Sequence, residues 1–511
     1  MKTILGLFVG FSLFIGGALE AQEMPYHIPD VVTHQIKSTN VDQTFDLVIN
    51  NGRVIDPESG LNEIRNVAIT EGTIVAISTE ALKGKRQINA QGLIVSPGFI
   101  DLHAHGQDLF GAKLQAQDGV TSQLELELGV YPVAPWYLSR EGKAPINFGA
   151  TVGHMASRIS AITGYMPEGL VPSPDELAQV FARRDWADNQ ADESVLKDIH
   201  SNIKEGLSEG ALGVGLIMAH TPGATREEIY SVFKIAADEG VTSFVHSRGA
   251  GLQEQSGSID AMQELLANVA STGSSLHVVH INSSGLSKVP VILEMFDNAR
   301  ANGIDVTTEV YPYKAFSTFI GSALFDEGFQ EKQGIDYTDL QHPETGEFFK
   351  EASFKKLRAK APGTVIIGHG MTEDNVSAAI AHPGVIIASD GVPYVNGKAH
   401  PRGAGTYSRV LGRYVRELKV LTLFDAIKKM SYLPAKRLED AVPQMKNKGR
   451  IKIGADADIV IFDADTVKDK ATFKDPALPS VGIIHVLVGG EFIVKDTKYL
   501  EGVFLGQAIR R

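Results

Sequence analysis

The middle of the chain alternates short apolar segments with longer amphipathic stretches, and this alternation limits the folds open to it. A parallel sheet with crossover helices has this pattern. About eight strand-helix units over roughly 300 residues match the size of a (β/α)8 TIM-like barrel, whose active site lies at the carboxyl ends of its strands. Nine apolar segments compete for the eight places: 93–102, 122–128, 146–152, 213–217, 243–245, 276–281, 306–311, 365–368 and 385–388.

The two ends of the chain have a different, β-rich pattern. Short apolar runs separated by turn residues occur at 45–49, 53–56, 67–69 and 74–77, and again at 458–462, 482–488 and 491–494. We expect the two ends to pair into one small β-sandwich. The predicted α/β architecture is therefore a sandwich formed by 45–95 and 449–511 around a barrel formed by 96–448, with the polar stretch 325–356 as a surface insertion.

The first residues have the order of a secretory signal peptide. Lys2 precedes an apolar run over 4–19, and small residues follow, with cleavage sites after Ala18 or Ala21. The alternative is an uncleaved membrane anchor, although the run is short for a span. We predict a signal peptide over 1–21, a polar extension over 22–44, and no stable membrane insertion after cleavage.

Composition narrows the compartment and the partners. The chain has 511 residues, no cysteine and a formal net charge of −13. The absence of cysteine excludes disulfides and thiolate metal ligands, and with the signal it favours a bacterial periplasmic or secreted protein. The negative charge argues against nucleic acid or an anionic membrane as a partner, because both bind clustered basic residues.

Histidines and an aspartate follow the apolar segments where a barrel mouth would be. His103 and His105 close the first segment, His246 and His280 close two later ones, and Asp390 closes the last. A lone His-x-His or a single histidine at a strand end is commonly no more than a hydrogen-bonded polar group. Five such residues at strand ends that meet at one mouth predict a divalent metal site, because imidazole and carboxylate are metal ligands.

Two glutamates add a possible bridging group. Glu125 and Glu127 alternate with leucines on one predicted strand, so both side chains point to one face. A buried carboxylate requires a partner such as a metal ion, whereas on an exposed edge strand it would need none. Four histidines, an aspartate and a glutamate can hold two metal ions with a bridging hydroxide. Such a centre catalyses metal-assisted hydrolysis.

These motifs resemble the metal-dependent amidohydrolase superfamily. The resemblance rests on the segment 96–105 (SPGFIDLHAH) and the tail 454–460 (GADADIV). Within that superfamily, 311–313 (YPY) and 400–412 (HPRGAGTYSRVLG) resemble the D-aminoacylase branch, whose members deacylate N-acyl-D-amino acids. More narrowly, 106–108 (GQD), 118–121 (DGVT) and 124–127 (LELE) are similar to N-acyl-D-glutamate deacylases.

The resemblance implies roles residue by residue. His103 and His105 match the first-strand metal ligands, His246 and His280 match those of the fifth and sixth strands, and Asp390 matches the catalytic aspartate. A cysteine bridges the metals in D-aminoacylases, and Glu127 takes its place here, with Glu125 as the alternative. The carboxylated lysine that bridges the metals in dihydroorotases and hydantoinases has no counterpart in 213–217. The implied cofactor is a divalent metal, zinc by family expectation, as one or two ions.

Arg402 resembles the family arginine that binds the substrate carboxylate, with a surface salt bridge as the alternative. Tyr311 and Ser317 match family positions near the substrate, although the tyrosine could simply pack. Two positions depart from the family pattern, with Asn282 where a lysine is expected and Met218 where a tyrosine is expected. Arg248 could replace the lost cation or serve a salt bridge elsewhere.

The sequence thus predicts a hydrolase of the linear amide in a small N-acyl-D-amino acid, with N-acyl-D-glutamate as one candidate. Two alternatives remain: a cyclic amidase or dipeptidase of the same superfamily, and a catalytically inactive binding protein built on the same scaffold.

Overall fold

The fold is described from a computed structural model that covers residues 44–169, 176, 179–180 and 182–511. These described residues form one compact unit. The predicted signal peptide and most of the extension lie outside the described residues. Within the described ranges, no helix is both long and apolar enough to cross a membrane.

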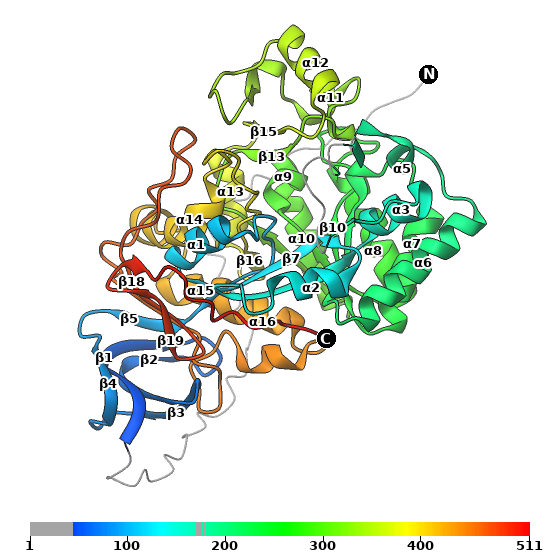
Figure 1. The fold of residues 1–511 in the computed structure, drawn as a ribbon. Helices are drawn as coiled ribbons and strands as arrows, with labels where there is room; N and C mark the ends of the chain where they lie inside the picture. Colours follow the sequence, from blue (N-terminus) through cyan, green and yellow to red (C-terminus); the bar gives the residue numbers. More distant parts are fainter. Residues whose placement is uncertain (1–43, 170–175, 177–178, 181) are drawn as a thin grey trace, which may run out of the picture. The chain divides into compact units, whose positions relative to one another are not determined.

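Eight parallel strands form the barrel (Figure 1), which confirms the predicted fold class. Each strand pairs with the next along the chain, and the bridge between Ala104 and Gly391 brings the first and last strand ends together. The strands are β6 (Phe99–Asp101), β7 (Val120–Val130), β8 (Asn147–Gly153), β9 (Gly213–Ile217), β10 (Thr242–His246), β11 (Ser275–Val278), β12 (Val306–Val310) and β16 (Val385–Ile387).

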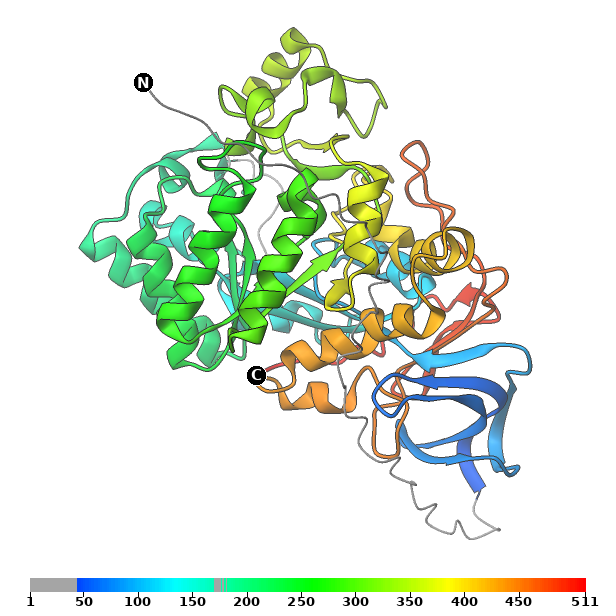
Figure 2. The same cartoon turned by 180° about the vertical axis from the view of Figure 1, so that it is seen from behind.

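Helices pack on the outside of these strands, with α8 and α10 in green in Figure 2. They form where apolar residues recur every three or four positions, as Ile199, Ile203 and Leu207 do in α6. The side chain of Asp192 caps that helix by accepting from the Val195 amide at 2.9 Å. The principal helices are α1 (Leu109–Gln117), α2 (Val133–Arg140), α3 (His154–Thr163), α6 (Glu193–Ser208), α7 (Arg226–Asp238), α8 (Ser258–Thr272), α10 (Val289–Ala301), α13 (Glu373–Ala381), α14 (Arg402–Arg409) and α16 (Leu433–Leu438).

The ninth apolar segment belongs to a separate lobe. β15 (Val365–Gly368) pairs antiparallel with β13 (Phe316–Phe319) and β14 (Leu340–Gln341), outside the barrel. With α11 (Phe329–Gln333) and α12 (Glu351–Lys360), these strands enclose an apolar core that includes Phe325, Phe329 and Phe354. The insertion is therefore larger than the predicted 325–356 and has a core of its own, because its scattered phenylalanines converge only after folding.

The two chain ends form one nine-stranded sheet, which confirms the predicted β domain built from both ends. The antiparallel pairing of β5 with β17 joins the N-terminal and C-terminal halves. The residue-level boundaries 45–95, 96–448 and 449–511 stay predictions. The strands of this nine-stranded sheet are β1 (Thr44–Asp56), β2 (Leu61–Thr70), β3 (Thr73–Ser78), β4 (Lys83–Asn89), β5 (Ile94–Pro97), β17 (Ile459–Phe462), β18 (Ile483–Val488), β19 (Glu491–Lys495) and β20 (Lys498–Tyr499).

A buried charge cluster connects this sheet to the barrel. Lys448 Nζ lies 2.8 Å from Asp458 Oδ2 and 2.9 Å from Asp456 Oδ2, and the Asn147 amide of β8 donates to Asp458 Oδ2 at 2.9 Å. Burial by itself lowers the pKa of Lys448, but the two aspartates outweigh this effect and raise it. The ammonium group is therefore held charged between sheet and barrel.

The Lys448→Met substitution should lower the free energy of unfolding by about 3–5 kcal/mol, because it leaves the buried Asp458 without its cation. Urea unfolding followed by the fluorescence of Trp136 and Trp186 would measure the loss. The same substitution at Lys234, whose pair with Asp238 is exposed, should change stability by less than about 0.5 kcal/mol. Equal losses of stability at Lys448 and Lys234 would contradict the stabilising role that we assign to the buried ion pair.

Candidate metal centre and active site

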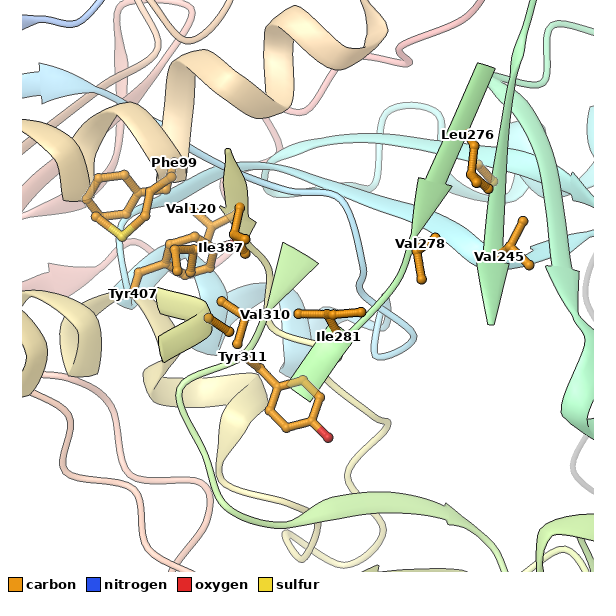
Figure 3. Close-up of a cluster of buried hydrophobic side chains, with 14 of the residues drawn as sticks. Phe99, Val120, Val245, Leu276, Val278, Ile281, Val310, Tyr311, Ile387 and Tyr407 are labelled. Carbon is orange, nitrogen blue, oxygen red and sulfur yellow. The ribbon is translucent and has the colours of Figure 1, made fainter. Parts of the chain in front are cut away.

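Six buried or nearly buried side chains meet at the carboxyl ends of the barrel strands. They form two groups, His103 with His105 and Asp390, and Glu127 with His246 and His280, and in each group the possible ligand atoms lie within 4.8 Å of one another. The strands that carry them are anchored from behind by apolar side chains such as Val245, Val278 and Ile387 (Figure 3). Packing of the strands against the helices thus fixes where these polar groups meet.

Glu127 is the carboxylate that spans both groups. Its Oε1 lies 2.9 Å from His246 Nδ1 and 2.9 Å from His280 Nε2, and its Oε2 lies 3.1 Å from His103 Nε2 and 3.2 Å from His105 Nε2. Glu125 instead contacts the other side of one ring, with Oε2 at 2.8 Å from His105 Nδ1. Of the two glutamates, Glu127 is therefore the one that spans both groups, and Glu125 supports His105.

Both glutamates are less than 6% exposed, so the exposed-edge interpretation of their strand is wrong. Asp390 completes the first group, with Oδ1 at 3.4 Å from His103 Nε2 and 3.5 Å from His105 Nε2. Asp390 and His280 also have φ values of 53° and 33°, a left-handed region that is costly for residues with a side chain. Such backbone strain is typical of functional sites.

The donor set fits divalent metal ions. His103 Nε2 and His105 Nε2 lie 3.0 Å apart, and His246 Nδ1 and His280 Nε2 lie 3.1 Å apart. Buried imidazole nitrogens that face one another need shared cations or protons between them. Imidazole together with carboxylate suits zinc and related divalent ions.

The charges around these histidines and carboxylates favour binding of a cation. Burial lowers the pKa of the His103 imidazole, but the carboxylates of Asp390, Glu127 and Glu309 outweigh burial and raise it well above its ordinary value. Burial raises the pKa of Glu127, and the surrounding histidines bring it well below its ordinary value. The carboxylates are therefore ionised in a buried site, which a bound cation would stabilise.

The centre opens on a cavity of about 950 Å³. Among the site residues, His105, Glu125, Glu127, His246, His280 and Asp390 line it. His220 also lines it, and the sequence analysis missed this residue, which follows β9 in the turn after the fourth strand. Its ring lies 5.6 Å from that of His246, and burial lowers its pKa to about 3, so that it stays neutral near neutral pH.

The amidohydrolase family model matches residues 86–494, which include every strand of the barrel. The chain belongs to the amidohydrolase family. Within it, this amidohydrolase lies in the D-aminoacylase branch. An N-acyl-D-glutamate deacylase of Alcaligenes xylosoxydans xylosoxydans is 32% identical over 88% of this chain and 93% of its own length, and a D-aminoacylase of the same organism is 26% identical over 92% and 98%.

A crystal structure of N-acyl-D-glutamate deacylase from Bordetella bronchiseptica has a similar fold. It superposes with a TM-score of 0.76 and 27% identity, covering 92% of this amidohydrolase and 100% of the other chain. That enzyme was crystallised with zinc and a phosphonate inhibitor that mimics the tetrahedral intermediate.

Arg402 is deeply buried beside the metal centre of this amidohydrolase, so the surface salt-bridge interpretation is wrong. It is 1% exposed, its Nη2 lies 2.8 Å from Asp390 Oδ1, and its guanidinium stacks on Tyr311 at 4.7 Å. Its Nε and Nη1 have no hydrogen-bond partner among the described residues. Two unsatisfied buried donors next to Asp390 are suited to an incoming carboxylate.

The other predicted substrate residues lie around Arg402. Tyr311 is 1% exposed, and its hydroxyl has no partner within the described part of the chain. Ser317 lines the cavity, but its hydroxyl donates to the Ile366 carbonyl at 2.9 Å. Ser317 and Asp390, which the Arg402 guanidinium contacts, both line the cavity.

The structure also shows what the residues at and near the departures from the family pattern contact. The Asn282 amide donates to the Tyr311 carbonyl at 3.2 Å and so supports the backbone instead of supplying a cation. Arg248 donates to the Ala224 carbonyl at 2.9 Å and pairs with Glu264 at 3.3 Å. It therefore serves a salt bridge and does not replace the lost lysine. Met218 is buried in the core.

Glu309 of β12 is a further residue that the sequence analysis missed. Its Oε1 lies 2.5 Å from His103 Nδ1, and its Oε2 lies 3.0 Å from His277 Nε2. Burial raises the pKa of Glu309, and the two histidines outweigh burial and lower it to about 2. The ionised carboxylate fixes the His103 ring so that Nε2 faces the centre. An acidic residue within a predicted barrel strand was the signal available.

The Glu309→Gln substitution should weaken metal binding about 10- to 100-fold, because the amide supports the His103 ring less well than a carboxylate does. Isothermal titration calorimetry of the chelator-treated protein with Zn²⁺ would measure the change in affinity. Glu351→Gln, in an exposed pair with Lys355, is the matched control and should bind as the unchanged protein does. An unchanged affinity of Glu309→Gln would contradict the positioning role.

Proposed function

We propose that this amidohydrolase removes the acyl group from N-acyl-D-amino acids by metal-dependent hydrolysis, releasing the D-amino acid and a carboxylate. The observation that carries the proposal is Glu127, whose two oxygens face two pairs of histidines beside Asp390 at the floor of an open cavity. The similarity to N-acyl-D-glutamate deacylase and D-aminoacylase supports the substrate class.

The metal site would be held by His103, His105 and Asp390 on one side and by His246 and His280 on the other, with Glu127 between them. Zinc, as one or two ions, is the cofactor we propose, and the zinc in the Bordetella relative supports it. Bound there, the metal would polarise the amide carbonyl and lower the pKa of water toward about 7.

Asp390 is the residue that we propose moves the proton. We assign it the role of base toward the attacking water and then of acid toward the departing amine, so one carboxyl group serves both steps. Burial raises the pKa of Asp390, but Arg402 and His103 outweigh burial and lower it. The carboxylate therefore begins in the ionised form that a base requires.

Arg402 would bind the substrate carboxylate through its two unsatisfied donors. Tyr311 stacks beneath its guanidinium and keeps the plane in place, and Ser317 contributes to the neighbouring wall through its carbonyl, 3.4 Å from Arg402 Nη2. With Asn282 in place of a lysine, Arg402 supplies the positive charge nearest Asp390.

Neither a cyclic-amide hydrolase nor an inactive scaffold is favoured. Residues 213–217 include no lysine, and the two groups that could hold a metal contain every predicted ligand.

Turnover of N-acetyl amino acids of both hands tests the proposal. The D-enantiomers should be hydrolysed and the L-enantiomers should not, and treatment with a chelator should abolish turnover until Zn²⁺ is restored. Preference for L-substrates, or turnover that survives the chelator, would overturn it.

The Asp390→Asn variant serves the same test, with an expected loss of about 10²- to 10⁴-fold in kcat, because the amide cannot exchange the proton. Metal analysis of the purified variant separates lost catalysis from lost metal. Asp374→Asn, on an exposed position of α13, is the control and should retain activity.

We also propose export to the periplasm or exterior with removal of residues 1–21. The order of Lys2, an apolar run and small residues supports this proposal. Mass spectrometry of the protein from fractionated cells should find a mature chain beginning after Ala18 or Ala21 outside the cytoplasm. A cytoplasmic chain that retains Met1 would contradict it.

A further inference from the structure

One side of the cavity is an apolar chamber built by the end of β7 and by helices α2 and α3. We name it the acyl chamber and define it by six cavity-lining residues: Leu128, Pro132, Trp136, Met155, Ala156 and Ile159. Trp136, Met155 and Ile159 are 7%, 4% and 7% exposed, so they are packed in place. No member carries a charge, and the chamber therefore suits hydrocarbon.

The Tyr131 hydroxyl and one nitrogen of Arg140, on the same wall, are bonded to neighbouring groups. The Tyr131 hydroxyl contacts Asn202 Oδ1 at 2.9 Å and Glu205 Oε2 at 2.8 Å, both on α6. Arg140 Nη1 donates to Ser139 Oγ at 2.9 Å and to the Trp136 carbonyl at 3.3 Å, and its guanidinium stacks on the Trp136 ring at 4.0 Å. Arg140 Nε has no partner among the described residues, so this wall keeps one buried donor beside its apolar surface.

The acyl chamber lies across the barrel from Arg402. In strand order β8 is third and β12 is seventh, so these two strands stand opposite each other in the closed barrel of eight. The chamber residues of α3 follow β8, while Tyr311 and Ser317, which contact the Arg402 guanidinium, follow β12. The metal centre lies between these two sides, since its ligands come from β6, β7, β10, β11 and the end of β16.

An N-acyl amino acid has its carboxylate on the nitrogen side of the amide and its acyl chain on the carbonyl side. With the carboxylate at Arg402 and the carbonyl at the metal centre, the acyl chain leaves toward the opposite side of the barrel. We propose that the acyl chamber binds this chain, and that the preferred substrates are N-acyl amino acids with long, unbranched hydrocarbon acyl groups. This inference rests on the proposed function.

The size of the cavity agrees with a long acyl chain. Pockets for drug-sized ligands occupy roughly 300–1,000 Å³. At about 950 Å³, this cavity lies at the upper end of that range, and an N-acetyl amino acid would leave most of it to water. Because apolar walls bind hydrocarbon better than they bind water, each added methylene group should improve binding.

The test measures kcat/KM for one series of N-acyl-D-alanines, from acetyl to decanoyl, together with N-succinyl-D-alanine. D-alanine keeps the side chain small, so that only the acyl group varies. We expect kcat/KM to rise up to about fourfold per methylene until the chamber is full, from the transfer free energy of a buried CH₂. The succinyl compound, whose charged end would meet an apolar wall, should be poorer than its uncharged counterpart of similar length.

Ala156→Phe places a ring inside the acyl chamber, and it should lower the ratio of decanoyl to acetyl turnover at least tenfold. Ala270→Phe, the same change on an exposed position of α8, is the matched control and should keep the unchanged ratio. Should Ala156→Phe fail to fold, Ile159→Ala enlarges the same wall and should shift the best substrate to a longer chain.

Each outcome has one meaning. Hydrolysis of N-acetyl-D-alanine with no gain for longer chains would overturn the acyl chamber and leave the proposed function standing. Preference for the succinyl compound would overturn it in favour of an anion site at Arg140. An Ala156→Phe variant with an unchanged ratio would also overturn it. Failure to hydrolyse any N-acyl-D-amino acid would contradict the proposed function itself.

Discussion

The structure around the active site depends on one buried carboxylate, Glu127. Its two oxygens lie between 2.9 and 3.2 Å from four imidazole nitrogens on three separate strand ends. A carboxylate buried in this way is stable only with positive charge around it, and protonated histidines or metal ions supply that charge. Glu127 therefore links the closure of the barrel to the ability to bind a cation.

Further carboxylates extend this arrangement outward. Glu125 and Glu309 each accept from the Nδ1 side of a first-strand histidine and so leave both Nε2 atoms facing the centre. Asp390 is balanced by Arg402, whose remaining donors face no partner within the described residues. The same network that orients the predicted ligands thus leaves a buried cation beside Asp390, where we propose that the substrate carboxylate binds.

Much of this could be predicted from the sequence, because it depends on local patterns. Strand periodicity and the residues that close each strand located His103, His246 and Asp390 at one mouth, and the motif at 96–105 indicated the family. The patterns failed where a segment lacked a local signal. Residues 365–368 have the apolar pattern of a barrel strand but belong to the insertion. The core of the insertion contains phenylalanines such as Phe354 that are far apart in the sequence and meet only in the folded chain.

The sequence by itself determined the barrel, the two-ended sheet and the set of histidines and carboxylates, since each follows from periodicity or from residue type at a strand end. Only the tertiary structure decided that Glu127 spans the two groups while Glu125 supports His105, that Glu309 and His220 belong to the site, and that Arg248 does not. These outcomes depend on distances between strands far apart in the chain. Barrel closure and helix packing set those distances, and neither is encoded in any single segment.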